Sequence, residues 1–218
     1  MVTFALIAEG KTDIAVIESI LYSVYTDNYR INPVMPLMDA TDTYRNAPEY
    51  FSNWQLVLTY LATNQIRLAL AANDYLIVHI DTDLGEHPNF GLEISKFGIT
   101  NDILTIVNSC KQILLSKLDA ELTDSERDRI IFAIPVLTTE CWLIGLYDLK
   151  HQHKPNTINN CEARLHIAVN RSIKIVKTYD GYLKLSRNFM KSKITRQVSA
   201  RVECLNLFLS ALPPSKVI

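Results

Sequence analysis

The chain opens with the stretch that decides its fold: residues 2–10 read Val-Thr-Phe-Ala-Leu-Ile-Ala-Glu-Gly. Seven consecutive apolar or β-branched residues that end in a turn are typical of a buried strand in a parallel sheet. The period then changes, because apolar residues from Ile14 to Tyr25 recur at helical spacing, and Thr12 or Asp13 can cap the start of that helix. This opening predicts a strand, a tight turn and a helix.

The same alternation of strand-like and helix-like segments continues to about residue 150. The expected strands are residues 75–80 and 130–136, with an edge strand or loop at 31–38, where two prolines fall. The expected helices are residues 54–72, 99–118 and 138–149, with a loop at 84–98 and a charged, solvated segment at 121–129. This order implies βαβ units, so the expected fold class is α/β, with a largely parallel sheet flanked by helices.

The character of the chain changes near residue 150. The tail is richer in Lys and Arg, and its apolar periods are helical, with a final helix expected at residues 198–212. We therefore expect residues 1–149 to form the α/β domain and residues 150–218 to form a helical C-terminal extension packed on it.

Composition limits the possible partners and the compartment. The formal net charge of −1 gives no global field that attracts nucleic acid, so such contact needs local patches or a partner. No apolar run approaches the ~20 residues that span a bilayer, and the N-terminus lacks the basic region of a signal peptide. We expect a cytoplasmic protein without membrane association. The cysteines lack CxxC spacing and predict free thiols in a reducing compartment: Cys110, Cys141, Cys161 and Cys204.

Acidic residues follow three of the expected strands. Glu9 ends the first strand, Asp81 and Asp83 end the strand at 75–80, and Glu140 lies shortly after the strand at 130–136. Because ligands of open α/β sheets bind beyond the carboxyl ends of the strands, we expect these carboxylates to gather on one rim. Carboxylates within ~4–6 Å of each other repel unless a cation or protons neutralise them.

The acids also indicate which ion and which chemistry to expect. Hard oxygen ligands without His or Cys suit Mg²⁺ or Mn²⁺ rather than Zn²⁺. Asp81 and Asp83 are two residues apart, so on extended backbone they point the same way and can hold one ion or two. Such ions polarise phosphate oxygens and lower the pKa of an attacking water. Glu9, with its pKa raised by acidic neighbours, would serve as general acid or base.

Two residues near the acids each allow two interpretations, one functional and one structural. Asp13 is either a metal ligand or an acid favoured by the positive end of the helix dipole. His79 either contacts a metal-bound water or packs in the strand, and packing is the favoured reading.

Two further motifs are set aside. Gly10-Lys11-Thr12 resembles the end of a P-loop, but Ala5 stands where a P-loop needs glycine, so we expect no nucleotide site. A possible zinc set has no standard spacing, and we expect a solvated polar loop there: His151, His153, Cys161 and His166.

The motif Ala-Glu-Gly-Lys-Thr-Asp at residues 8–13, followed by Ile-Val-His-Ile-Asp-Thr-Asp at 77–83, resembles the Toprim domain of topoisomerases, primases and OLD-family nucleases. Thr-Glu-Cys-Trp-Leu at residues 139–143, after Ile-Pro-Val at 134–136, is similar to the later motif of small, stand-alone DUF4276-like Toprim proteins associated with phage defence. The resemblance covers residues 2–149.

This resemblance implies metal-dependent cleavage or joining of DNA or RNA, with Glu9 in acid–base chemistry and Asp81 and Asp83 as metal ligands. It also implies roles for Asp13 and Glu140 as further acids. A downstream lysine near the scissile phosphate is implied too, and the candidates are Lys191 and Lys193. The family further implies a role in prokaryotic defence beside an ATPase partner of the ABC or AAA type.

The tail carries the most basic local stretch of the chain. Its residues either contact a nucleic-acid backbone or form a solvated helix face. The residues assigned to nucleic-acid contact are Lys11, Arg187, Arg196 and Arg201. The leading hypothesis is a Mg²⁺- or Mn²⁺-dependent nuclease. The alternatives are a non-catalytic binding subunit and, last, a Toprim ligase or primase, because no zinc-binding or polymerase region is present. A homo-oligomer stays open.

Overall fold

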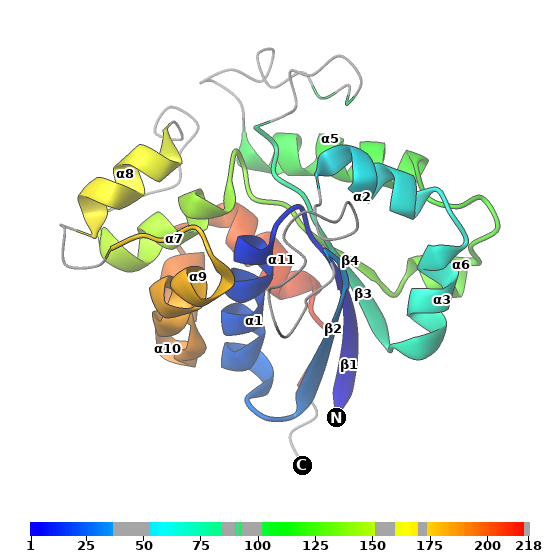
Figure 1. The fold of residues 1–218 in the computed structure, drawn as a ribbon, viewed down its shortest axis with the longest axis horizontal. Helices are drawn as coiled ribbons and strands as arrows, with labels where there is room; N and C mark the ends of the chain where they lie inside the picture. Colours follow the sequence, from blue (N-terminus) through cyan, green and yellow to red (C-terminus); the bar gives the residue numbers. More distant parts are fainter. Residues whose placement is uncertain are drawn as a thin grey trace.

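The centre of the computed structural model is a sheet of four parallel strands in the order β2-β1-β3-β4. The structure describes residues 1–36, 53–83, 90, 92, 102–150, 160–169 and 174–215. The strands are β1 (Val2–Ile7), β2 (Tyr29–Met35), β3 (Tyr75–His79) and β4 (Ile130–Ala133). With helices on both sides of this sheet (Figure 1), the predicted α/β class is confirmed.

The amino-acid sequence explains the order of the strands. β1 lies between β2 and β3, and from Phe4 to Ala8 its side chains are fully buried, as the apolar run predicts. β2 is an edge strand, where Pro33, which has no backbone N–H, is tolerated. Of the edge strand or loop expected at residues 31–38, the edge strand is confirmed as far as Met35, and residues 37–38 lie outside the described part. β4 ends before Pro135, earlier than expected.

Helices follow the strands in the expected alternation. The helices before residue 150 are α1 (Lys11–Tyr25), α2 (Trp54–Leu61), α3 (Gln65–Ala72), α5 (Ile103–Ser116), α6 (Asp124–Arg127) and α7 (Thr139–Tyr147). Later residues form α8 (Cys161–Ala168), α9 (Tyr179–Ser186), the 3₁₀ helix η3 (Arg187–Met190), α10 (Ser192–Ser199) and α11 (Glu203–Ala211). Most of the loop expected at residues 84–98 lies outside the described residues.

One expected long helix, residues 54–72, is in fact two helices. α2 ends at Leu61, whose carbonyl accepts a hydrogen bond from the backbone N–H of Asp119 at 2.8 Å. Thr63 and Asn64 then form a turn, since their short polar side chains compete with the helical backbone for hydrogen bonds. The break lets the chain turn while both helices keep buried faces, so the prediction of a single helix was wrong.

The final helix expected at residues 198–212 is also broken, between α10 and α11. Val198 and Val202, on either side of the break, both pack against Gly145 of α7. A Cβ at residue 145 would lie 2.5 Å from a methyl group of Val198, so this approach requires glycine. The break thus fits the C-terminal helices closely onto α7.

The helices after residue 160 pack on the α/β part of the chain. α9 and η3 lie against α1, α10 lies against α7, and α11 covers β4 and α5 (Figure 1). Trp142 of α7 stacks on Phe208 of α11 with ring centres 5.8 Å apart. Among the described residues, no helix is both long and apolar enough to cross a bilayer.

A disulfide joins Cys141 of α7 to Cys161 of α8. The prediction that all cysteines are free thiols was therefore wrong for this pair, although Cys110 and Cys204 are buried thiols outside the disulfide. The two bonded residues are 20 positions apart, and only the return of α8 onto α7 brings them together. The expectation of a reducing compartment depended on free thiols and loses its basis. Cys161 and His166 lie on α8, whereas His151 and His153 fall outside the described residues.

Candidate metal centre

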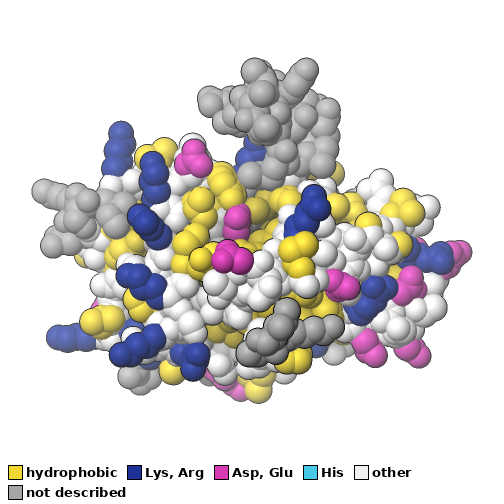
Figure 2. Space-filling model, turned by 90° about the horizontal axis from the view of Figure 1, so that it is seen from below, with side chains coloured by type: hydrophobic (Ala, Val, Ile, Leu, Met, Phe, Trp, Pro, Cys, Tyr) yellow, Lys and Arg dark blue, Asp and Glu magenta, His cyan; other side chains and the backbone are white. Residues whose placement is uncertain are grey.

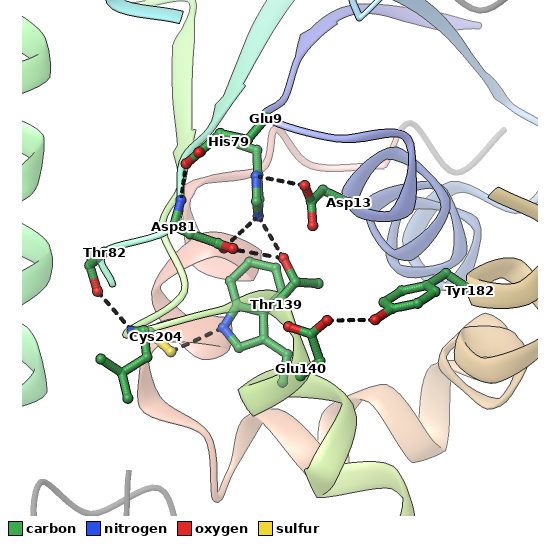
Figure 3. A network of polar contacts seen from close by, with 11 residues as sticks. Glu9, Asp13, His79, Asp81, Thr82, Thr139, Glu140, Tyr182 and Cys204 are labelled. Atoms are coloured by element: carbon green, nitrogen blue, oxygen red, sulfur yellow. Dashed lines mark hydrogen bonds and ion pairs between the residues drawn. The ribbon is translucent and has the colours of Figure 1, made fainter. Parts of the chain in front are cut away.

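The acidic residues gather where β1 and β3 end. Glu9 follows β1, Asp13 lies in the first turn of α1, and Asp81 lies just beyond β3 (Figure 3). The backbone N–H of Asp81 donates to Oε1 of Glu9 at 2.7 Å, which ties the two strand ends together. This contact follows from the parallel pairing of β1 with β3. The carboxyl edge of the sheet therefore holds a compact acidic cluster.

His79, the last residue of β3, lies inside this cluster and is fully buried. Its Nδ1 is 3.9 Å from Oδ2 of Asp13, and its Nε2 is 3.6 Å from Oδ1 of Asp81. One ligand atom from each of these three residues lies within 4.8 Å of the other two, so together they could hold a metal ion. His79 also packs edge-on against Trp142. The favoured packing interpretation is thus incomplete, because the ring is packed and also faces both carboxylates.

Thr139 connects the histidine to the second carboxylate. Its hydroxyl lies 2.9 Å from Nε2 of His79 and 3.4 Å from Oδ1 of Asp81 (Figure 3). Thr139 begins α7 and is buried, so the loop after β4 brings it under the ring. Sequence reasoning missed Thr139, although it immediately precedes Glu140 and could have been considered with it.

Glu140 lies in the first turn of α7, next to Thr139. Its Oε1 accepts a hydrogen bond from the hydroxyl of Tyr182 at 2.5 Å. Tyr182 is buried on α9, so the C-terminal extension holds this carboxylate in place. Nothing in the sequence around Tyr182 indicates this contact, which joins residues 42 positions apart.

Asp83 does not belong to the candidate ligand group of Asp13, His79 and Asp81. β3 ends at His79, before Asp81, and the side chain of Asp83 is exposed. The backbone N–H groups of Thr82 and Asp83 both donate to the carbonyl of Leu137, which fixes this loop against the one after β4. Asp83 and Glu140 instead line a neighbouring pocket. The role of Asp83 as a metal ligand stays a prediction.

That pocket has a volume of about 530 Å³, which is within the range of small-ligand sites. One wall is α8, which contributes Cys161 and Glu162 from its first turn and His166 from its last turn. The disulfide from Cys161 to Cys141 attaches this wall to α7. The helical extension therefore supplies one side of a pocket whose other side is acidic.

Burial and mutual repulsion shift the pKa values of the cluster. Burial, with the charges of Asp13 and Asp83, raises the pKa of Glu9 to about 8. Burial, with the charge of Glu140, raises the pKa of Asp13 to about 7. Burial and the charges of Asp13 and Glu9 raise the pKa of Asp81 well above its usual range. Burial lowers the pKa of His79 to about 3, so its imidazole is neutral. Protons or a cation must balance these carboxylates.

The basic residues expected to contact nucleic acid lie in several places. The side chains of Arg187, Lys191, Lys193 and Arg196 are exposed, and Figure 2 shows Lys and Arg gathered on the side of the molecule where the C-terminal helices lie. Arg201 instead donates to the carbonyls of Gly145, Asp148 and Leu149 at the end of α7, which is a structural role. Lys11 lies at the start of α1, beside the acidic cluster.

A lysine that sequence reasoning did not select lies nearer the acidic pocket. Lys177 pairs with Glu162 at 2.8 Å. Its pKa is raised by that hydrogen bond and by the charges of Glu162 and Glu140. Lys191 by contrast bonds locally, to Asn188.

Comparisons of the chain with protein-family models, with curated proteins and with solved structures found no match. The Toprim resemblance therefore depends on the motifs at residues 8–13, 77–83 and 134–143. The geometry of the cluster stands independently of it. The geometry shows two carboxylates and one imidazole, suited to a metal ion, at the carboxyl edge of a parallel sheet, with Asp13 and His79 buried and Asp81 partly buried.

Proposed function

We propose that this chain is a divalent-metal-dependent nuclease that hydrolyses phosphodiester bonds of DNA or RNA. The observation that carries this proposal is the convergence of Glu9, Asp13 and Asp81 at the carboxyl edge of the sheet, the usual ligand position in open α/β folds. The residues fit a cation, because the carboxylates of Asp13 and Asp81, with raised pKa values, lie beside the buried His79 ring. The ring nitrogen that faces Asp13, Nδ1, has no hydrogen-bond partner among the described residues.

Asp13 and Asp81 would hold the ion, with Glu140 and Asp83 beside them. A bound divalent ion polarises phosphate oxygens and lowers the pKa of water. Glu9 is suited to proton transfer, because a pKa near 8 lets it both accept and release a proton near neutral pH. The hydrogen bond from the backbone N–H of Asp81 fixes one oxygen of Glu9 and so orients the carboxyl group.

The charge distribution supports a polyanionic substrate. Residues 150–218 carry 13 Lys or Arg and 3 Asp or Glu, whereas residues 1–149 carry 9 Lys or Arg and 20 Asp or Glu. The small net charge is therefore the sum of an acidic part and a basic extension. The extension can attract nucleic acid, whereas the acidic part repels it. The defence role and an ATPase partner form part of the same proposal and are supported by the Toprim resemblance.

The test uses the purified full-length chain, freed of metal and supplied with Mg²⁺ or Mn²⁺, on labelled single- and double-stranded DNA and RNA. We expect metal-dependent cleavage that Asp81→Asn lowers at least roughly 100-fold, since it removes a ligand and a buried charge. Asp128→Asn is the matched control, because Asp128 is an exposed acid just before the amino end of β4. Cleavage that survives Asp81→Asn would refute the assignment. A chain that binds the ion but cleaves none of these substrates would favour a binding subunit.

A further inference from the structure

One buried nitrogen in the cluster has no hydrogen-bond partner in the described part of the chain. We assign His79 the tautomer that carries its proton on Nε2, because the Thr139 hydroxyl donates to Oδ1 of Asp81 and its oxygen can then accept from Nε2–H. The neutral ring carries one proton, and Nδ1 is left with a lone pair. His79 is fully buried, and Nδ1 has no hydrogen-bond partner among the described residues. A buried acceptor of this kind costs stability unless something fills its lone pair.

The nearest charged group cannot fill it. Oδ2 of Asp13 is 3.9 Å from Nδ1, which is too long for a hydrogen bond. Two lone-pair donors that bind one ion at about 2.1 Å lie roughly 3–4 Å from each other. The separation of Nδ1 and Oδ2 therefore suits a shared cation.

We propose that His79 is itself a metal ligand, together with Asp13 and Asp81, and that the site consequently takes a first-row transition ion such as Mn²⁺ in preference to Mg²⁺. Mg²⁺ prefers an all-oxygen shell, whereas an imidazole nitrogen favours transition ions. We draw this from the metal-binding half of the proposed function alone, so it holds or fails whether or not the chain cleaves nucleic acid.

The surroundings of the ring support this role. A metal-binding histidine usually has its second nitrogen held by another group, which fixes the tautomer and the direction of the lone pair. Thr139 holds Nε2 in this way, and Trp142 packs edge-on against the ring with centres 6.3 Å apart. Trp142 is itself held by Phe208 and by a hydrogen bond to Sγ of Cys204. The ring therefore has little freedom to turn Nδ1 away from Asp13.

The experiment is Mn²⁺ binding to the metal-free, full-length chain, followed by titration and by pulsed electron paramagnetic resonance. We expect a ¹⁴N coupling from a coordinated imidazole, and Mn²⁺ affinity at least roughly tenfold above that for Mg²⁺. In His79→Gln the amide can still reach Thr139, but no atom replaces Nδ1. We expect this variant to lose the nitrogen coupling and to bind Mn²⁺ roughly tenfold or more weakly, with a much smaller change for Mg²⁺.

His166→Gln is the matched control, because His166 is an exposed histidine that lines the adjoining pocket. It should leave the nitrogen coupling intact. Absence of nitrogen coupling in the wild-type chain, or its persistence in His79→Gln, would overturn the inference, as would equal affinity for Mg²⁺ and Mn²⁺. If His79→Gln does not fold, the wild-type spectrum and the Mg²⁺ competition still decide. Mg²⁺-dependent cleavage without nitrogen coupling would contradict the role of His79 while leaving the proposed nuclease intact.

Discussion

The α/β part and the helical extension of this chain differ in charge and in what they give to the candidate site. The α/β part supplies the acids of the cluster, through the ends of β1 and β3 and the first turns of α1 and α7. The extension is basic, and it supplies Tyr182, which holds Glu140, and the α8 wall of the pocket. Residues 1–149 therefore place the proposed ligands, whereas the extension holds Glu140 and forms one wall of the adjoining pocket.

The largest expected effect is on stability, and it comes from removing the disulfide that cross-links the two regions. The Cys141–Cys161 bond closes a loop with a sequence separation of 20, which corresponds to about 3 kcal/mol of stability in the chain-entropy model. We expect Cys161→Ser to lower the free energy of unfolding by roughly that amount, as measured by urea denaturation. Cys110→Ser, at a free buried thiol, is the control and should cost less. Equal losses in the two variants would mean that α8 is held by packing alone.

The same contrast explains how much of the structure could be predicted from the sequence. The strands and their acids follow local patterns, such as the apolar run before Glu9, so the α/β class and the convergence of Glu9 with Asp81 were predictable. His79 was undervalued because it belongs to an apolar run, where burial is the simpler expectation. Tyr182 and the disulfide depend on the return of distant helices, which no local period encodes. The break after Leu61 likewise depends on a hydrogen bond from Asp119.

The next effect is the pH dependence of stability, which comes from the acidic cluster at the carboxyl edge of the sheet. Between pH 4.5 and about 7, unfolded carboxyls are ionised while Glu9 and Asp13 in the folded chain keep their protons. Asp81 also keeps its proton to a higher pH than an unfolded carboxyl, because its pKa is raised. The folded state then binds more protons, so stability falls as pH rises, by up to about 1.4 kcal/mol per pH unit for each carboxyl. His79 has the opposite effect on stability between pH 3 and 6.5, because its pKa is lowered in the folded state and the unfolded state binds the extra proton. Over that range it cancels the contribution of one carboxyl.

We therefore expect the metal-free chain to unfold at lower urea concentration at pH 7.5 than at pH 5.5. Mn²⁺ should remove most of this difference, because the ion replaces the protons and stabilises the folded state at high pH. Asp81→Asn should flatten the dependence in the metal-free chain. A metal-free chain that becomes more stable between pH 5.5 and 7.5 would contradict the raised pKa values of the cluster.

The smallest effect separates a contact that orients the site from one that only stabilises the fold. Tyr182 and Tyr179 both lie on α9, and each hydroxyl donates to a glutamate of the α/β part, Glu140 for Tyr182 and Glu18 for Tyr179. Removing either hydroxyl should cost about 1 kcal/mol of stability, the usual net value of a hydrogen bond. Only Tyr182→Phe should also weaken Mn²⁺ binding, by a few-fold, because Glu140 lies beside the cluster and Glu18 does not. If both variants bind Mn²⁺ like the wild-type chain, the extension stabilises the α/β part without orienting its acids. The two regions would then differ in charge but not in their part in ion binding.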